Sequence, residues 1–130
     1  AAAGAAQEEG ALPAEVEAHY WDELQAHMQR EKPFLDNKLR IADLAGQLDM
    51  PVHHLSQTIN RRAGESFSEF INRHRVDAAK GLLNDPEKPI AMITFDAGFN
   101  SESAFYRHFK NFTGKTPRQY RRELRPQANA

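Results

Sequence analysis

Apolar side chains recur along most of this chain at intervals of three or four residues, which is the spacing of amphipathic helices. The first such stretch lies between Pro13 and Pro33, and its apolar stripe consists of Val16, Tyr20, Leu24 and Met28. No segment alternates apolar and polar residues as a half-buried strand would. The pattern predicts an all-α protein that begins with an amphipathic helix over residues 13–32.

Two capping boxes mark the beginnings of later helices. In such a box, the side chains of a Ser or Thr and of a Glu or Gln three residues later each bind the other residue's backbone amide. The two boxes are Ser66 with Glu69, and Thr116 with Gln119. They predict a long helix over residues 66–83 and a last helix over residues 117–124, the latter with Pro117 at its first position.

A unit of two helices occurs twice in the chain. Residues 41–64 and 90–114 align, with a one-residue insertion, so that apolar residues and a closing glycine match. The matched pairs are Ile41 and Ile90, Leu44 and Ile93, Leu48 and Ala97, Met50 and Phe99, Leu55 and Phe105, Ile59 and Phe109, and Gly64 and Gly114. Two helices joined by a tight turn form a helix-turn-helix. We therefore predict two helix-turn-helix subdomains joined by the 66–83 helix, about seven helices in all, preceded by the extra N-terminal helix.

Charge is distributed unevenly along the chain. The formal net charge of the 130 residues is −1, but residues 1–32 carry −5 and residues 33–130 carry +4. Residues 1–12 are small and acidic, so we expect a disordered linker or an expression remnant there, and a disordered tail at 126–130. The excess of positive charge in the main part of the chain suits a polyanionic partner.

Both second helices of the repeated units carry polar side chains on the face that does not enter the core. These are His53, Ser56, Gln57 and Asn60 in the first unit, and Ser103, Tyr106, Arg107 and Lys110 in the second. Gln and Asn bond bidentately to adenine, Arg bonds to guanine, and Ser or His donates or accepts. The two stripes predict surfaces that read base edges in duplex DNA.

Basic residues surround both stripes. Lys and Arg at such positions neutralise phosphates and hold the register without reading the sequence. The predicted phosphate contacts are Arg61, Arg62, Arg73, Arg75, Lys110, Lys115, Arg118, Arg121 and Arg122. By their spacing, Phe105, Phe109 and Phe112 are expected in the core rather than stacked on single-stranded bases.

Over roughly residues 34–124, the sequence resembles the DNA-binding domain of the AraC/XylS family of bacterial transcription regulators. The matching residues are IADLAGQLDM, then HHLSQTINRRAGESFSEFINRHRVDAAKGLL, then ITFDAGFNSESAFYRHFKNFTGKTPRQYRREL. The resemblance implies a sequence-specific DNA-binding domain over residues 33–125, whose two recognition helices enter successive major-groove segments about one helical turn (~34 Å) apart.

The resemblance also assigns residues and partners. Carried over by position, the base contacts are His53, Ser56, Gln57, Glu102, Ser103 and Arg107, with Tyr106 on base or backbone. Glu102 either accepts from a cytosine amino group or turns away from the DNA. The implied partners are promoter or operator DNA, RNA polymerase for an activator, and an N-terminal sensor domain missing from this chain. The lead-in is similar to the subgroup with a membrane-embedded sensor, which implies a cytoplasmic domain, tethered in that case to the inner membrane.

Other classes of function lack a signal in the sequence. Without cysteine there is no thiolate ligand or nucleophile, and adjacent histidines diverge by about 100° on a helix, so no metal or other cofactor is expected. Paired catalytic carboxylates, a nucleophile elbow and a phosphate-binding glycine loop are missing, so we do not expect an enzyme. One alternative stays open, a helical protein-interaction or dimerisation module that uses residues 13–32. A homodimer through that helix or through the missing region is also left open. Salt-sensitive duplex binding favours the DNA reader, and salt-indifferent self-association favours the module.

Overall fold

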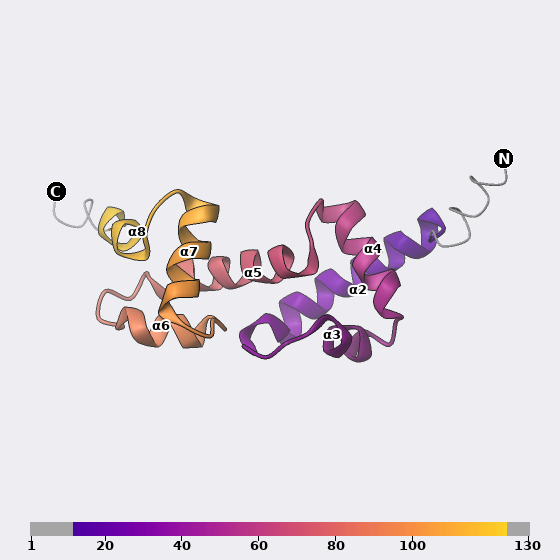
Figure 1. Cartoon of the computed structure of the whole chain (residues 1–130), viewed down its shortest axis with the longest axis horizontal. Coiled ribbons are helices and arrows are strands. Elements are labelled where there is room, and N and C mark those ends of the chain that lie inside the picture. The colour runs from indigo at the N-terminus through magenta and orange to yellow at the C-terminus, as the bar shows by residue number, and fades with distance from the viewer. Residues whose placement is uncertain (1–11, 125–130) are drawn as a thin grey trace. The chain divides into compact units, whose positions relative to one another are not determined.

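The computed structural model describes residues 12–124, and within that range it contains seven α-helices, one short 3-10 helix (Pro33–Leu35) and no strand (Figure 1). The α-helices are α2 (Ala14–Glu31), α3 (Ile41–Leu48), α4 (Val52–Ala63), α5 (Phe67–Leu82), α6 (Ile90–Asp96), α7 (Glu102–Thr113) and α8 (Pro117–Glu123). The prediction of an all-α protein is confirmed. Residues 1–11 and the predicted tail at 126–130 lie outside the described residues.

The helices form two compact units, and α5 contributes residues to both. In the described range, the first unit contains residues 12–33 and 39–70, and the second contains residues 34–38 and 71–124. Each unit holds one of the repeated helix pairs, α3 with α4 in the first and α6 with α7 in the second. The chain therefore contains two helix-turn-helix subdomains, as the internal repeat predicts.

The core of the first unit lies where α2, α3 and α4 pack together. The side chains of Leu24, Leu44, Leu55 and Ile59 are all 0% exposed. Val16, which was predicted on the apolar stripe of the N-terminal helix, is instead 36% exposed, and Val52 is 43% exposed. Val16 lies in the first turn of α2, and Val52 is the first residue of α4.

The N-terminal helix α2 uses its apolar stripe inside its own unit. Leu24 and Met28 are 0% and 2% exposed, and α2 packs on both α3 and α4. Two of the four stripe residues through which residues 13–32 would dimerise are therefore already covered by the same chain, and dimerisation through this helix stays a prediction.

The second unit has an aromatic core. Phe99, Phe105 and Phe109 pack with aliphatic residues of α5 and α6. The ring of Tyr120 in α8 meets Phe109 edge-on, with ring centroids 5.4 Å apart. Phe112, which was predicted in this core, is 38% exposed, so that prediction is wrong. It lies one residue before the end of α7.

The helix ends follow the local signals in the sequence. The amide of Glu69 donates to the Ser66 hydroxyl over 3.1 Å, and the Glu69 carboxylate accepts from the Ser66 amide over 2.9 Å. Hydrogen bonding from the Ser66 amide, and from the Ser66 side chain, to the Glu69 carboxylate holds the pKa of this carboxyl below its ordinary value. The Thr116 and Gln119 pair makes the same reciprocal bonds at the start of α8. Gly64 and Gly114 end α4 and α7 in the left-handed conformation.

A short segment before α3, residues 34–38, belongs to the second unit. The Arg75 guanidinium of α5 donates to the carbonyl oxygens of Phe34 and Asp36, over 2.7 and 2.9 Å. Gly98 has a φ of +98°, and a Cβ there would lie 2.3 Å from the Phe34 carbonyl oxygen. Both contacts hold the segment against the second unit.

In the range 12–124, none of the helices combines the length and the apolar character that a membrane span requires.

Candidate nucleic-acid interface

The second helix of each repeated unit is held by buried residues on one side only. In α4, Leu55, Thr58 and Ile59 are buried, and the Thr58 hydroxyl donates to the His54 carbonyl oxygen over 2.8 Å. In α7, Phe105 and Phe109 are buried, and the Ser101 hydroxyl accepts from the Ala104 amide at the start of the helix. Each helix thus turns its other side to the surface, where the predicted reading stripes lie.

The stripe of α4 is only partly open. His53 and Asn60 are exposed, whereas Ser56 and Gln57 are half-buried. The side-chain carbonyl oxygen of Gln57 accepts a hydrogen bond of 3.2 Å from the Leu12 amide, so the chain just before α2 reaches this stripe. The Gln57 amide nitrogen is a separate donor group. Sequence reasoning missed this contact because Leu12 lies 45 residues away.

His54 belongs to a different side of α4 from the reading stripe. Its ring lies between that of His53, with centroids 4.3 Å apart, and that of Tyr20 in α2, at 5.9 Å. The second histidine of the pair is therefore part of the contact between α2 and α4.

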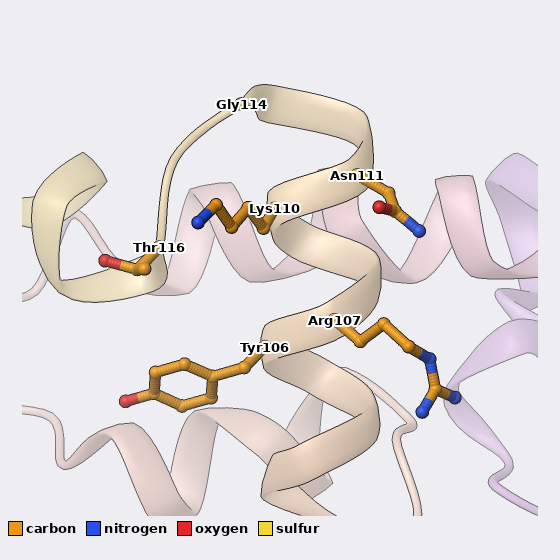
Figure 2. Close-up of a pocket in the computed structure, with 6 residues that line it drawn as sticks. All are labelled: Tyr106, Arg107, Lys110, Asn111, Gly114 and Thr116. Carbon is orange, nitrogen blue, oxygen red and sulfur yellow. The ribbon is translucent and has the colours of Figure 1, made fainter.

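The stripe of α7 borders an open hollow lined by Tyr106, Arg107, Lys110, Asn111, Gly114 and Thr116. Figure 2 shows Tyr106 and Lys110 projecting to one flank of α7, toward Thr116, while Arg107 and Asn111 project to the other. Asn111 was not among the predicted contacts. Its position four residues after Arg107, on the same helix face, is the signal that would have found it.

The first turn of α7 presents its polar side chains to the surface. Glu102 and Ser103 are both exposed, and Ser101 caps the helix. A carboxylate in the first turn of a helix is stabilised by the backbone amides there. Glu102 therefore has a structural reason for its position that is independent of any base contact.

His108 lies behind the α7 stripe and packs against Phe99, with nearly parallel rings and centroids 6.1 Å apart. Burial lowers the pKa of His108, and the positive charges of Arg107 and Arg75 lower it further. The imidazole is therefore held toward its neutral form beside the reading surface.

Of the predicted phosphate contacts, two lie at the end of α4 and meet an acidic residue of α2. Glu17 is buried, and its carboxylate accepts from Nε of Arg62 over 2.9 Å and lies 3.4 Å from Nε of Arg61. Neither guanidinium is buried by this contact, because the Arg61 and Arg62 side chains remain 54% and 36% exposed.

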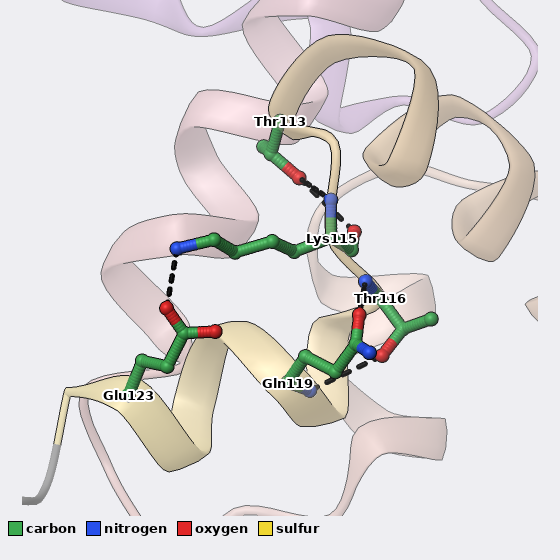
Figure 3. Close-up of polar contacts among 5 residues, drawn as sticks. All are labelled: Thr113, Lys115, Thr116, Gln119 and Glu123. Carbon is green, nitrogen blue, oxygen red and sulfur yellow. Dashed lines mark hydrogen bonds and ion pairs between the residues drawn. The ribbon is translucent and has the colours of Figure 1, made fainter.

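Three further predicted phosphate contacts are engaged by the second unit itself. Arg121 donates to the carbonyl oxygens of Asp85 and Lys88, over 3.1 and 2.6 Å, and Arg75 holds the 34–38 segment. Burial lowers the pKa of Arg75, and the nearby Asp36 charge opposes that shift. The Lys115 ammonium pairs with Glu123, as Figure 3 shows beside the Thr116 and Gln119 capping box.

The remaining predicted basic residues divide by exposure. Lys110, Arg118 and Arg122 are exposed and form no ion pair with another described residue. Arg73 is half-buried in α5 and already interacts with other groups of the protein. Of these three, Lys110 lies on α7 and lines the hollow of Figure 2, whereas Arg118 and Arg122 lie on α8.

Comparison with known proteins gives the same picture. A family model described as "Helix-turn-helix domain" matches residues 44–123. The Msm operon regulatory protein of Streptococcus mutans is 32% identical over 88 residues, which cover 68% of this chain and 32% of that protein. The melibiose operon regulatory protein of Escherichia coli is 31% identical over 87 residues, covering 67% of this chain and 29% of that protein. The chain thus spans about a third of the length of these relatives.

Solved structures share the fold. The C-terminal domain of AraT, a response regulator from Geobacillus stearothermophilus, matches 80% of this chain and 84% of its own, with a TM-score of 0.68 and 28% identity. The DNA-binding domain of AdpA, solved in complex with a target DNA, matches 83% of this chain and 94% of its own, with a TM-score of 0.70. At 18% identity, the second likeness concerns the fold alone.

Two helix-turn-helix subdomains with exposed polar second helices define a DNA-binding domain of the helix-turn-helix class. The chain belongs to the AraC-type family of transcription regulators, and sequence-specific DNA binding is the function of its domain. The resemblance drawn from the sequence motif is confirmed, and the matching family is one of regulators rather than enzymes.

Proposed function

We propose that this domain reads two separate segments of one duplex, with α4 and α7 as its recognition helices in successive major-groove segments. The observation that carries the proposal is the repeated arrangement itself. Each unit buries one side of its second helix and leaves polar, directional side chains on the other. An α-helix fits the B-DNA major groove, where each base pair presents a distinct pattern of donors and acceptors.

In the first unit, His53, Ser56, Gln57 and Asn60 are the proposed base contacts. His53 and Asn60 are the exposed members and reach bases without rearrangement. Gln57 contributes the donors of its amide nitrogen, because its oxygen already accepts from Leu12. Asn60 has both a donor and an acceptor to offer an adenine edge.

In the second unit, the proposed base contacts are Glu102, Ser103 and Arg107, with Tyr106 on base or backbone. Arg107 is exposed and carries the fixed fork of donors that matches guanine O6 and N7. We add Asn111 as a candidate, because it projects to the same flank of α7 as Arg107. Tyr106 and Lys110 face the other flank, where a DNA backbone lies if Arg107 faces the base edges.

For phosphate binding, the surface favours Lys110, Arg118 and Arg122, with Arg61, Arg62 and Arg73 as further contacts. We leave Arg75 and Arg121 out of this set, because backbone carbonyl oxygens of the second unit already occupy their guanidinium groups. Lys115 reaches a phosphate only by leaving Glu123.

The relatives named above are regulators of operons, and we propose that this domain likewise directs a regulator to the promoter or operator of an operon.

Selection from a random duplex library, followed by titration of the selected and a scrambled duplex at several salt concentrations, tests the proposal. We expect two conserved base clusters about one helical turn apart, and an affinity that falls linearly with salt on a log–log plot. A single conserved cluster would contradict the assignment of two readers. Equal affinity for selected and scrambled duplexes would contradict base reading by either helix.

A further inference from the structure

Glu17 is an acidic residue buried in the first unit, on the face of α2 that packs against α4. Glu17 is only 8% exposed, and carboxylates are seldom buried in proteins unless they are paired. Both of its partners, Arg61 and Arg62, are the basic residues in the last turn of the proposed recognition helix α4. The contact thus joins the N-terminal helix to the basic end of a DNA-reading element.

The charges of this cluster do not cancel. One carboxylate faces two guanidinium groups, so the three residues together carry a net charge of +1 where α4 alone would present +2. Both contacts are made through Nε, over 2.9 and 3.4 Å, and each arginine keeps its terminal nitrogens for another acceptor. The arginines are therefore placed and partly neutralised, but they are not removed from the surface.

We propose that Glu17 is a positioning residue that restrains the sequence-independent affinity of the first reading unit for DNA. By holding Arg61 and Arg62 and offsetting one of their charges, it reduces by one the number of phosphates that this end of α4 neutralises. The inference rests on the proposed function, because it assumes that α4 lies on the DNA.

This restraint lowers the affinity for every DNA duplex and leaves the preference among base sequences unchanged. Phosphate contacts carry no sequence information, so a change in their number alters binding to all duplexes alike. The first unit would then depend on the His53, Ser56, Gln57 and Asn60 stripe for its share of specific binding. The exposed cations on α7 and α8 of the second unit would then supply the part of the DNA affinity that comes from phosphate contacts.

The test is the salt dependence of DNA binding by Glu17→Gln, measured with a selected and a scrambled duplex. The substitution keeps the size of the side chain and an acceptor for Arg62, and it removes the charge. We expect the plot of the logarithm of the DNA association constant against the logarithm of the salt concentration to become steeper by about 0.9, which is the contribution of one further phosphate contact. Affinity at low salt should rise by roughly tenfold on both duplexes alike, since one more counterion is released.

Two single variants separate charge from packing. Glu23→Gln removes the same charge from the same helix at an exposed contact with His19, so it should leave the slope nearly unchanged. Glu17→Asp keeps the charge while shortening the side chain, and should also keep the slope of the unmodified chain. A slope for Glu17→Gln equal to that of the unmodified chain, or an equal steepening by either control, would overturn the proposal.

A double variant covers the case in which Glu17→Gln alone unfolds the first unit, as circular dichroism would show. Glu17→Gln with Arg62→Gln removes the buried anion together with its nearer cation, and the remaining Arg61 again gives a net charge of +1. We expect the slope of the unmodified chain, and any other slope would overturn the proposal. Failure of the proposed function looks different, because the unmodified chain would then show no preference for the selected duplex.

Discussion

At the scale of single residues, Arg107 is the side chain best placed to discriminate between base pairs. It is exposed on α7, pairs with no described acidic residue, and projects beside Asn111 (Figure 2). We expect Arg107→Ala to cost about 1–3 kcal/mol on the preferred duplex and to relax the preference at one base pair. Competition titrations against duplexes that vary at each position would measure both effects.

The matched control for Arg107 is Arg118, which is exposed in the first turn of α8. As a phosphate contact, Arg118→Ala should weaken preferred and scrambled duplexes by the same factor and make the salt slope shallower by about 0.9. An equal loss on both duplexes for Arg107→Ala would remove its role in reading bases.

His108 makes the stability of the second unit depend on pH. Its folded-state pKa is lowered, first by burial and then by Arg107 and Arg75, so protonation favours the unfolded chain. The free energy of unfolding should therefore decrease as the pH falls from about 6.5 to the lowered folded-state pKa, and should lose nothing more from this residue below it. Urea unfolding of the unmodified chain and of His108→Gln across this range would show a smaller decrease in the variant.

His19→Gln is the control for the pH experiment, because His19 is exposed on α2 in the other unit. It should leave the pH dependence of the second unit as it is in the unmodified chain. If His108→Gln and the unmodified chain lost stability in parallel, His108 would not be the group responsible.

At the scale of helices, glycines with and without surrounding space should respond in opposite ways to alanine. Gly98 is buried with a positive φ, and its added Cβ would meet the Phe34 carbonyl oxygen at 2.3 Å. Gly98→Ala should lower the free energy of unfolding by at least about 2 kcal/mol, from backbone strain and overlap together. Gly46 lies inside α3, and an added Cβ there would meet no other atom within 4 Å. Gly46→Ala should therefore raise the free energy of unfolding by about 0.5–1 kcal/mol. Urea denaturation of both variants measures the contrast, and a loss for both would contradict it.

The beginnings and ends of helices could be predicted because the interactions that fix them are local. The Ser66 and Glu69 box lies within four residues of chain, and its two bonds form as its sequence indicates. Which apolar residues are covered is set by other helices instead. The exposure of Val16 and Phe112 and the burial of Glu17 depend on neighbours that are distant in sequence, so helical spacing misassigned the first two and overlooked the third.

The candidate site shows the same division. Helical spacing alone predicted that His53, Asn60 and Arg107 would be exposed on the second helix of each unit, and they are exposed. It could not show that Gln57 accepts from Leu12, or that Arg75 holds the Phe34 carbonyl oxygen, because these partners lie 45 and 41 residues apart. A basic residue in a basic stretch is equally suited to a phosphate and to a carbonyl oxygen, and only the fold distinguishes them.

At the scale of the whole molecule, the two proposed recognition helices, α4 and α7, should contact bases at different positions of one DNA site. Gln57→Ala should relax the preference within one base cluster and Arg107→Ala within the other, about ten base pairs away. Each substitution should leave the other cluster unchanged, because the residues lie in separate units. Repeating the duplex selection with each variant would measure this. Loss of the same cluster in both variants would show that only one helix reads bases.

The placement of residues 34–38 determines how this protein can be divided. The chain enters the second unit at 34, returns to the first at 39, and enters the second again at 71, so no single cut yields two complete units. A fragment that starts at Ile71 lacks the carbonyl oxygens that Arg75 binds and the backbone that covers Gly98. Moving the second unit into another regulator would therefore require two pieces of chain, residues 34–38 and the piece from Ile71 onward. A library that exchanges only the C-terminal piece would produce proteins in which residues 34–38 no longer match the surface around Arg75 and Gly98.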